Sequence, residues 1–165
     1  MEVNGGSVTT SAQQLPLGYE VIRATDYNVI RDQKYLKNWP GYIDDLLVSG
    51  QVADAAIYDL SGACLATSRQ QFSLSLPEFS HIIYSYVDTD QLRAHGVTVN
   101  DVTYKLSYAD GRGGIMGRLG LPARGCSLCK TNQLLIVAVH SADMNSKKCN
   151  EHVMNIGDFF IGKNL

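Results

Sequence analysis

Several features that mark specialised classes of protein are scarce or missing in this sequence. Cysteine is one of them: four cysteines in 165 residues are too few for the disulfide-built scaffold of a small secreted protein. No apolar run approaches the roughly 20 residues that a membrane-spanning helix needs. The N-terminus also lacks the charged-then-apolar pattern of a secretion signal. We therefore expect reduced thiols and a cytoplasmic protein.

Motifs of the common enzyme classes are also missing. The glycine-rich stretch DGRGGIMGRLG, residues 110–120, lacks the G-x-x-x-x-G-K-[ST] pattern that cradles a nucleotide phosphate. No G-x-S-x-G nucleophile motif occurs. The histidines stand alone, and a lone histidine is more often a surface or structural residue than a catalytic one. We expect no catalytic residues, no cofactor and no enzymatic activity.

Cys126 and Cys129 have the C-x-x-C spacing of zinc and redox sites. A structural zinc site needs four ligands, and the other two cysteines are solitary. A thioredoxin-like pair needs a helix directly after it, whereas residues 130–140 predict a turn and a strand. Residues three apart in a strand face opposite sides of the sheet. We therefore expect two packing residues and no metal site, with a zinc or redox role as the less favoured alternative.

Charged residues are sparse, at 18% of the sequence, and the formal net charge is only −2. Their distribution is uneven, because residues 38–110 have nine acidic and three basic residues, whereas residues 111–165 have seven basic and three acidic ones. The basic segment favours a partner with a negative surface, whether a protein, a phospholipid headgroup or a nucleic acid. The alternative is a solvated basic edge without a partner.

The hydrophobic pattern predicts a helix, two strands, a second helix, about four strands and a closing helix. Pro40 fits the first position of the first helix, and Gly50 fits its C-terminal stop. The other two helices are expected at residues 77–87 and 147–162, and the strands at residues 52–60, 63–68, 102–110, 114–120, 126–131 and 133–140. This order indicates an α+β fold with a central antiparallel sheet. The N- and C-terminal helices should pack on one face and the remaining helix on the other.

Residues 1–37 differ in composition from the rest of the chain. The first 18 are rich in glycine, serine, threonine and glutamine, and YEVIRATD and YNVIRDQK then echo each other eight residues apart. Two imperfect copies are too few for a repeat architecture. We assign residues 1–37 to a partly flexible N-terminal extension and residues 38–165 to the folded domain.

Aromatic residues gather near both ends of this domain. Trp39 and Tyr42 lie one turn apart at the start of the first helix, and Phe159, Phe160 and Leu165 lie among the last seven residues. If the terminal helices pack side by side, these side chains form an apolar patch of the kind that binds polyproline II segments. The alternative is that they only cap the core.

Four stretches between Trp39 and Leu165 carry a family resemblance: WPGYIDDLL, AAIYDLSGACLATS, IMGRLG ahead of GCSLCKT, and CNEHVMNIGDFFIGKNL. Together, and in this order, they resemble the profilin family of small actin-monomer-binding proteins. The resemblance implies a central antiparallel sheet with the first and last helices on one face. It also implies a protein that regulates actin polymerisation and nucleotide exchange and docks proline-rich partners such as formins.

Carried onto this sequence, the resemblance implies specific binding residues. The polyproline groove is implied at Trp39, Tyr42, Phe159, Phe160 and Leu165. The actin face is implied at Arg118 and, more loosely, at Arg112, Lys130, Lys147 and Lys148. The family also binds phosphoinositide headgroups through basic residues, and that partner stays open here because the chain is mildly acidic. The implied protein is a cytoskeletal monomer without nucleic-acid binding; the alternative is a profilin-fold adaptor or small-ligand module without actin binding.

Three features depart from the family pattern. Leu65 stands where the family has a second groove tryptophan, so we expect weaker or altered polyproline affinity. The loop LPAR, residues 121–124, is longer than usual at the edge expected to meet actin. Residues 1–37 precede the position where the family ordinarily begins, and we expect them to fold back and modulate access to the groove. The alternative is a disordered appendage or a cover for a sheet edge.

Overall fold

The structure, a computed structural model, describes residues 38–165. The expected N-terminal extension, residues 1–37, lies outside the described residues. Among the residues described, no helix is both long and apolar enough to cross a bilayer.

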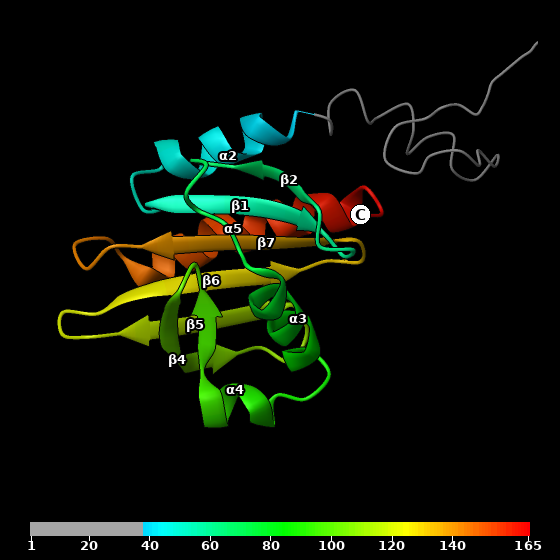
Figure 1. Cartoon of the computed structure of the whole chain (residues 1–165). Coiled ribbons are helices and arrows are strands. Elements are labelled where there is room, and N and C mark those ends of the chain that lie inside the picture. The colour runs from blue at the N-terminus through cyan, green and yellow to red at the C-terminus, as the bar shows by residue number, and fades with distance from the viewer. Residues whose placement is uncertain (1–37) are drawn as a thin grey trace, which may run out of the picture. The chain divides into compact units, whose positions relative to one another are not determined.

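Seven strands form one antiparallel sheet in the order β2-β1-β7-β6-β5-β4-β3 (Figure 1). Their bounds are β1 (Asp54–Asp59), β2 (Cys64–Thr67), β3 (Val97–Val99), β4 (Val102–Ala109), β5 (Gly114–Leu119), β6 (Arg124–Lys130) and β7 (Leu134–His140). β7 pairs with β1 on one side and β6 on the other. Nearly every residue of β7 is buried, as expected for an apolar strand with both faces covered.

Helices cover both faces of the sheet. α2 (Trp39–Val48) and α5 (Ser146–Gly162) pack on one face, whereas α3 (Leu76–Ser85) and α4 (Asp90–His95) pack on the other. The expected α+β fold, with the terminal helices on a common face, is therefore confirmed. The sequence pattern missed α4 and β3, because six and three residues are too few to show a periodicity.

A buried carboxylate joins α3 to the β3–β4 hairpin. Ser75 and Glu78 form a capping box at the start of α3, which satisfies backbone N–H groups that the helix itself leaves unpaired. The Glu78 carboxylate also accepts the N–H groups of Asn100, at 3.1 Å, and Asp101, at 2.8 Å. These two residues have positive φ, so the carboxylate holds a tight turn that glycine usually occupies. The helix and the hairpin are thus tied at one point.

One glycine allows α5 to pack closely on β6. A Cβ at Gly157 would come within 2.4 Å of the Cys129 Sγ and 3.5 Å of its Cβ. Both residues are buried. The absence of a side chain at Gly157 therefore sets how closely the helix approaches the strand.

This contact makes a stability prediction with a matched control on the same helix. Gly157→Leu should lower the free energy of unfolding by about 2–3 kcal/mol, because overpacking a filled site forces side chains and backbone apart. Gly162→Leu makes the same chemical change where nothing lies within 4 Å. It should leave stability unchanged or raise it by up to about 1 kcal/mol through helix propensity. Urea denaturation measures both, and equal losses in the two variants would contradict this account of the contact.

Candidate protein-binding surfaces

Four aromatic side chains from the two terminal helices form one cluster, called here the aromatic cluster: Trp39, Tyr42, Phe159 and Phe160. The Phe160 ring lies edge-on to Trp39 at 5.7 Å and to Tyr42 at 5.0 Å between centroids. Tyr42 also lies 5.8 Å from Phe159. These are favourable aromatic geometries. The structure therefore brings together four of the five residues that the sequence suggested for a groove.

The five residues expected to form the groove differ in depth. Phe159 is 43% exposed and Tyr42 is half-buried, whereas Trp39 is only 8% exposed. Phe160 is fully buried, and Leu165 is 3% exposed. The Leu165 carbonyl accepts the N–H of Asn132, which fixes the C-terminus against the β6–β7 turn. Phe160 and Leu165 therefore support the surface from beneath, and Phe159 and Tyr42 form its exposed part.

Polar groups of the aromatic cluster can recognise a ligand's backbone. The Trp39 Nε1 is buried and has no hydrogen-bond partner among the described residues. An unpaired buried donor costs about 1–3 kcal/mol, so a ligand carbonyl that reached it would relieve this cost. Burial and the nearby Asp45 raise the pKa of Tyr42, so its hydroxyl stays a donor at neutral pH.

Leu65 lies in an irregular part of the sheet beside α2. Ile57 of β1 pairs with Ala66, but the next residue, Tyr58, pairs with Cys64. Leu65 is the extra residue of this β-bulge and is half-buried. A bulge redirects side chains locally, so the contribution of position 65 does not follow from the regular alternation of a strand.

A second surface, called here the basic face, lies where α5 begins. Arg118 of β5 pairs directly with Lys105 of β4, and Lys147 and Lys148 lie in the first turn of α5. Arg118 borders a hollow of about 200 Å³, which is also lined by Met116, Ala123, His140, Met144 and Ser146. A small hollow with basic residues around it suits an acidic protein surface.

The five basic residues expected at the actin face do not all lie together in the structure. Arg118, Lys147 and Lys148 belong to the basic face. Arg112 lies in the β4–β5 turn, six residues from Arg118, or about 20 Å along an extended strand. Lys130 lies two and four residues after Leu128 and Cys126 in the same strand, so the three side chains share one face of the sheet. Cys126 and Leu128 line the core beneath α3, and Lys130 therefore points to the opposite side of the sheet from α5. Arg112 and Lys130 therefore do not join the basic face.

Sequence reasoning missed Lys105 and His140 at the basic face. Lys105 is exposed, and His140 is buried with its Nδ1 2.9 Å from the Ser141 carbonyl oxygen. Both lie in strands that the sequence predicts, at residues 102–110 and 133–140. The two-residue period of a strand could have indicated the sheet face of each residue, but not which strand lies beside which.

Cys126 and Cys129 point to opposite faces of the sheet, as the strand alternation predicts. Cys126 belongs to the core beneath α3, and Cys129 contacts Gly157 of α5. Burial raises the pKa of Cys126 to about 12 and that of Cys129 to about 11, so neither thiol is a ready nucleophile or ligand. Within residues 38–165, no group of three or more His, Cys, Asp or Glu residues is placed to hold a metal ion.

Comparison with known proteins identifies relatives over most of the chain. The family model for profilin matches residues 37–165. Profilin-3 of Dictyostelium discoideum is 30% identical over 122 residues, which cover 73% of this chain and 94% of that protein.

Solved structures show the same fold. The crystal structure of Acanthamoeba castellanii profilin II matches with a TM-score of 0.71 and 25% identity, over 78% of this chain and 100% of that chain. The structure of mouse profilin IIa in complex with a double repeat from the FH1 domain of mDia1 matches with a TM-score of 0.67 and 17% identity, over 78% and 99% of the two chains. On the family match and the shared fold together, the chain belongs to the profilin family.

Proposed function

We propose that this protein binds monomeric actin, regulates actin polymerisation and nucleotide exchange, and docks proline-rich partners, without catalysing a reaction itself. The observation that carries the proposal is the profilin match over residues 37–165, in a chain that has an aromatic cluster at one end of α5 and a basic face at the other. The proposed place of action is the cytoplasm, at the actin cytoskeleton.

The aromatic cluster is the proposed docking site for proline-rich segments. A polyproline II segment offers apolar rings and unpaired backbone carbonyls, and its conformation is already ordered before binding. Phe159 and Tyr42 would contact the rings, and the buried Trp39 Nε1–H would donate to a carbonyl once a small shift of its neighbours exposed it. Phe160 and Leu165 would support the groove from below. The mouse profilin bound to an FH1 double repeat supports this partner for the present chain.

The basic face is the proposed actin site. Two of its features oppose stability. Lys105 and Arg118 are like charges directly opposite each other, and Lys147 and Lys148 lie at the positive end of the α5 dipole. Neither Lys105 nor Arg118 has an ion pair among residues 38–165. Unfavourable local charges commonly mark functional surfaces, and an acidic actin surface would neutralise them. Phosphoinositide headgroups carry the same negative charge and are a second proposed partner.

Phe159→Ser tests the docking site. It should weaken binding of a decaproline peptide by roughly tenfold, or about 1.4 kcal/mol, through loss of the exposed aromatic contact. Ile161→Ser is the matched control, because Ile161 is 46% exposed but lies outside the aromatic cluster; its affinity should stay within about twofold. Trp39 is the only tryptophan, so its fluorescence reports on this site alone. Equal losses in both variants would contradict the proposed position of the groove.

Leu65 is expected to limit polyproline affinity. An aliphatic side chain lacks the indole ring and the N–H donor of the family's tryptophan, so the unmodified chain should bind decaproline with a dissociation constant of about 0.1 mM or weaker. Leu65→Trp should tighten binding by roughly fivefold. Titration calorimetry measures both, since a second tryptophan complicates the fluorescence. Micromolar or tighter binding by the unmodified chain would contradict this prediction.

Charge reversal at two arginines tests the actin face. Arg118→Glu should weaken the affinity for monomeric actin by at least tenfold, because it introduces repulsion at the centre of the basic face. Arg112→Glu makes the same change in net charge away from that face and should have an effect of less than about threefold. The inhibition of pyrene-actin polymerisation measures both. Equal losses would point to a diffuse charge effect, and no actin binding by the unmodified chain would favour the adaptor alternative.

A further inference from the structure

A second hollow lies on the α3 side of the sheet, apart from the aromatic cluster. It has a volume of about 270 Å³ and is bordered by the β2–α3 segment, the β3–β4 turn and the start of β6. Two arginines line it, Arg69 and Arg124, together with apolar side chains that include Phe72, Val102 and Val139. We call it the two-arginine hollow. Neither proposed protein-binding surface includes either arginine.

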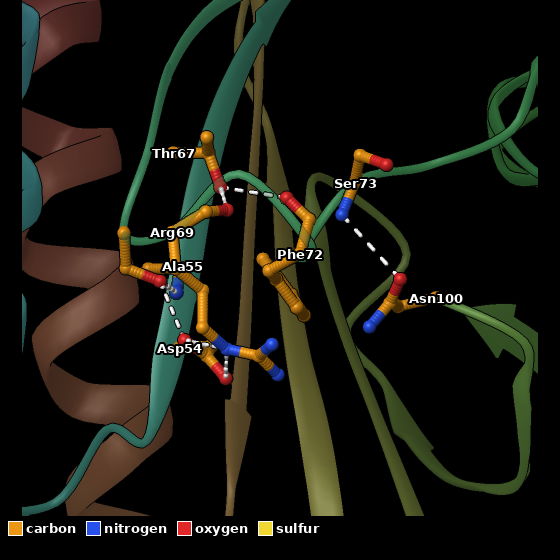
Figure 2. A network of polar contacts seen from close by, with 8 residues as sticks. Asp54, Ala55, Thr67, Arg69, Phe72, Ser73 and Asn100 are labelled. Carbon is orange, nitrogen blue, oxygen red and sulfur yellow. Dashed lines mark hydrogen bonds and ion pairs between the residues drawn. The ribbon is translucent and has the colours of Figure 1, made fainter.

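The side chain of Arg69 is 51% exposed and is oriented by its neighbours (Figure 2). Its Nε lies 3.1 Å from the Asp54 Oδ1 and 3.0 Å from the Oδ2. Asp54 is itself held, because its Oδ1 accepts the Ser68 hydroxyl at 2.7 Å, and the Ser68 Oγ accepts the Ala55 N–H at 3.1 Å. This network uses the Nε side of the guanidinium. It leaves both terminal nitrogens on the side away from Asp54, without a hydrogen bond in the described part of the chain.

Arg124 supplies the second cation. It is the first residue of β6 and lies two residues before Cys126 and four before Leu128. Its side chain therefore lies on the same face as theirs, the α3 side of the sheet. Its guanidinium has no hydrogen bond or ion pair within residues 38–165. Burial raises the pKa of Tyr104, and the charge of Arg124 counteracts that increase. Arg124 therefore acts on Tyr104, which also lines the hollow.

The charge of the two-arginine hollow favours a single negative charge. Asp54 is the only acidic side chain among its lining residues, and both of its oxygens are already occupied. Two arginines and one aspartate leave a net charge of +1. A carboxylate carries one negative charge and fits the paired terminal N–H groups of an arginine, whereas a phosphate monoester carries about −1.5 to −2 at neutral pH. The volume lies just below the roughly 300–1,000 Å³ of pockets for drug-sized ligands, which favours a smaller ligand.

We propose that the two-arginine hollow binds a small carboxylic acid, whose carboxylate lies between Arg69 and Arg124 and whose apolar part contacts Phe72, Val102 and Val139. Asp54 is a positioning residue in this site, because it acts through the orientation of Arg69. His140 lines both this hollow and the hollow of the basic face, so the two sites are neighbours.

Benzoate is a suitable probe, because it joins one carboxylate to a compact apolar ring. Titrated into the isotope-labelled full-length chain, it should cause saturable NMR shifts at the Arg69 and Arg124 Nε–H groups, with a dissociation constant of about 1 mM or tighter. Benzamide keeps the ring without the charge and should cause no saturable shift. Inorganic phosphate at matched ionic strength should bind at least fivefold more weakly. Equal binding of benzamide or of phosphate would overturn the assignment to a carboxylate.

Three variants test the residues. Arg69→Lys keeps the charge but loses the paired terminal nitrogens, and should weaken benzoate binding by at least fivefold. Arg124→Gln removes the second cation and should have a similar effect. Arg93→Gln is the matched control, because Arg93 is exposed and paired with Asp90 on α4 at 3.0 Å; it should leave the affinity unchanged. Well-dispersed spectra show that each variant is folded, and unchanged affinity in the first two would overturn the proposal.

Discussion

The close contact between Gly157 of α5 and Cys129 of β6 is the constraint on which the rest of the structure depends. It sets the distance of the helix backbone from the sheet, and this distance determines where all 17 residues of α5 lie. The helix is about 25 Å long, so one contact in its second half places both ends. The aromatic cluster lies at its C-terminal end and the basic face at its N-terminal end. Both proposed protein-binding surfaces therefore depend on the packing of the same helix.

The two surfaces differ in the physical forces that they offer a partner. The aromatic cluster offers apolar area and a buried N–H donor, which contribute to affinity at short range and depend little on salt. The basic face offers charge, which acts over roughly 8–10 Å at ordinary ionic strength and mainly sets association rate and partner choice. The two-arginine hollow differs from both, because Asp54 orients Arg69 and reduces the net charge of the hollow to +1. One monovalent anion neutralises that charge. Three different kinds of site can thus coexist on one small domain.

The long, regular elements could be predicted from the sequence, and the short ones could not. β7 and α5 have seven and 17 residues, which is long enough for the apolar pattern alone to indicate a buried strand and an amphipathic helix. β3 and α4 are too short for this, and the turn after β3 is held by the buried carboxylate of Glu78, with Asn100 and Asp101 at positive φ. Such local geometry depends on a contact between residues more than 20 positions apart, which no local pattern contains.

The sequence by itself determined the family, the order of the long elements and the residues from which binding surfaces could be made. Only the tertiary structure decided which of those residues reach the surface. Phe159 and Phe160 are neighbours, but successive residues point about 100° apart around a helix, and the packing of α5 against α2 leaves Phe159 exposed and Phe160 buried. Arg118 and Lys130 are both basic strand residues, but alternation and register place them on opposite faces. The chemical character of each side chain follows from the sequence. How deeply the side chain is buried, and which other side chains surround it, follow from contacts between distant segments.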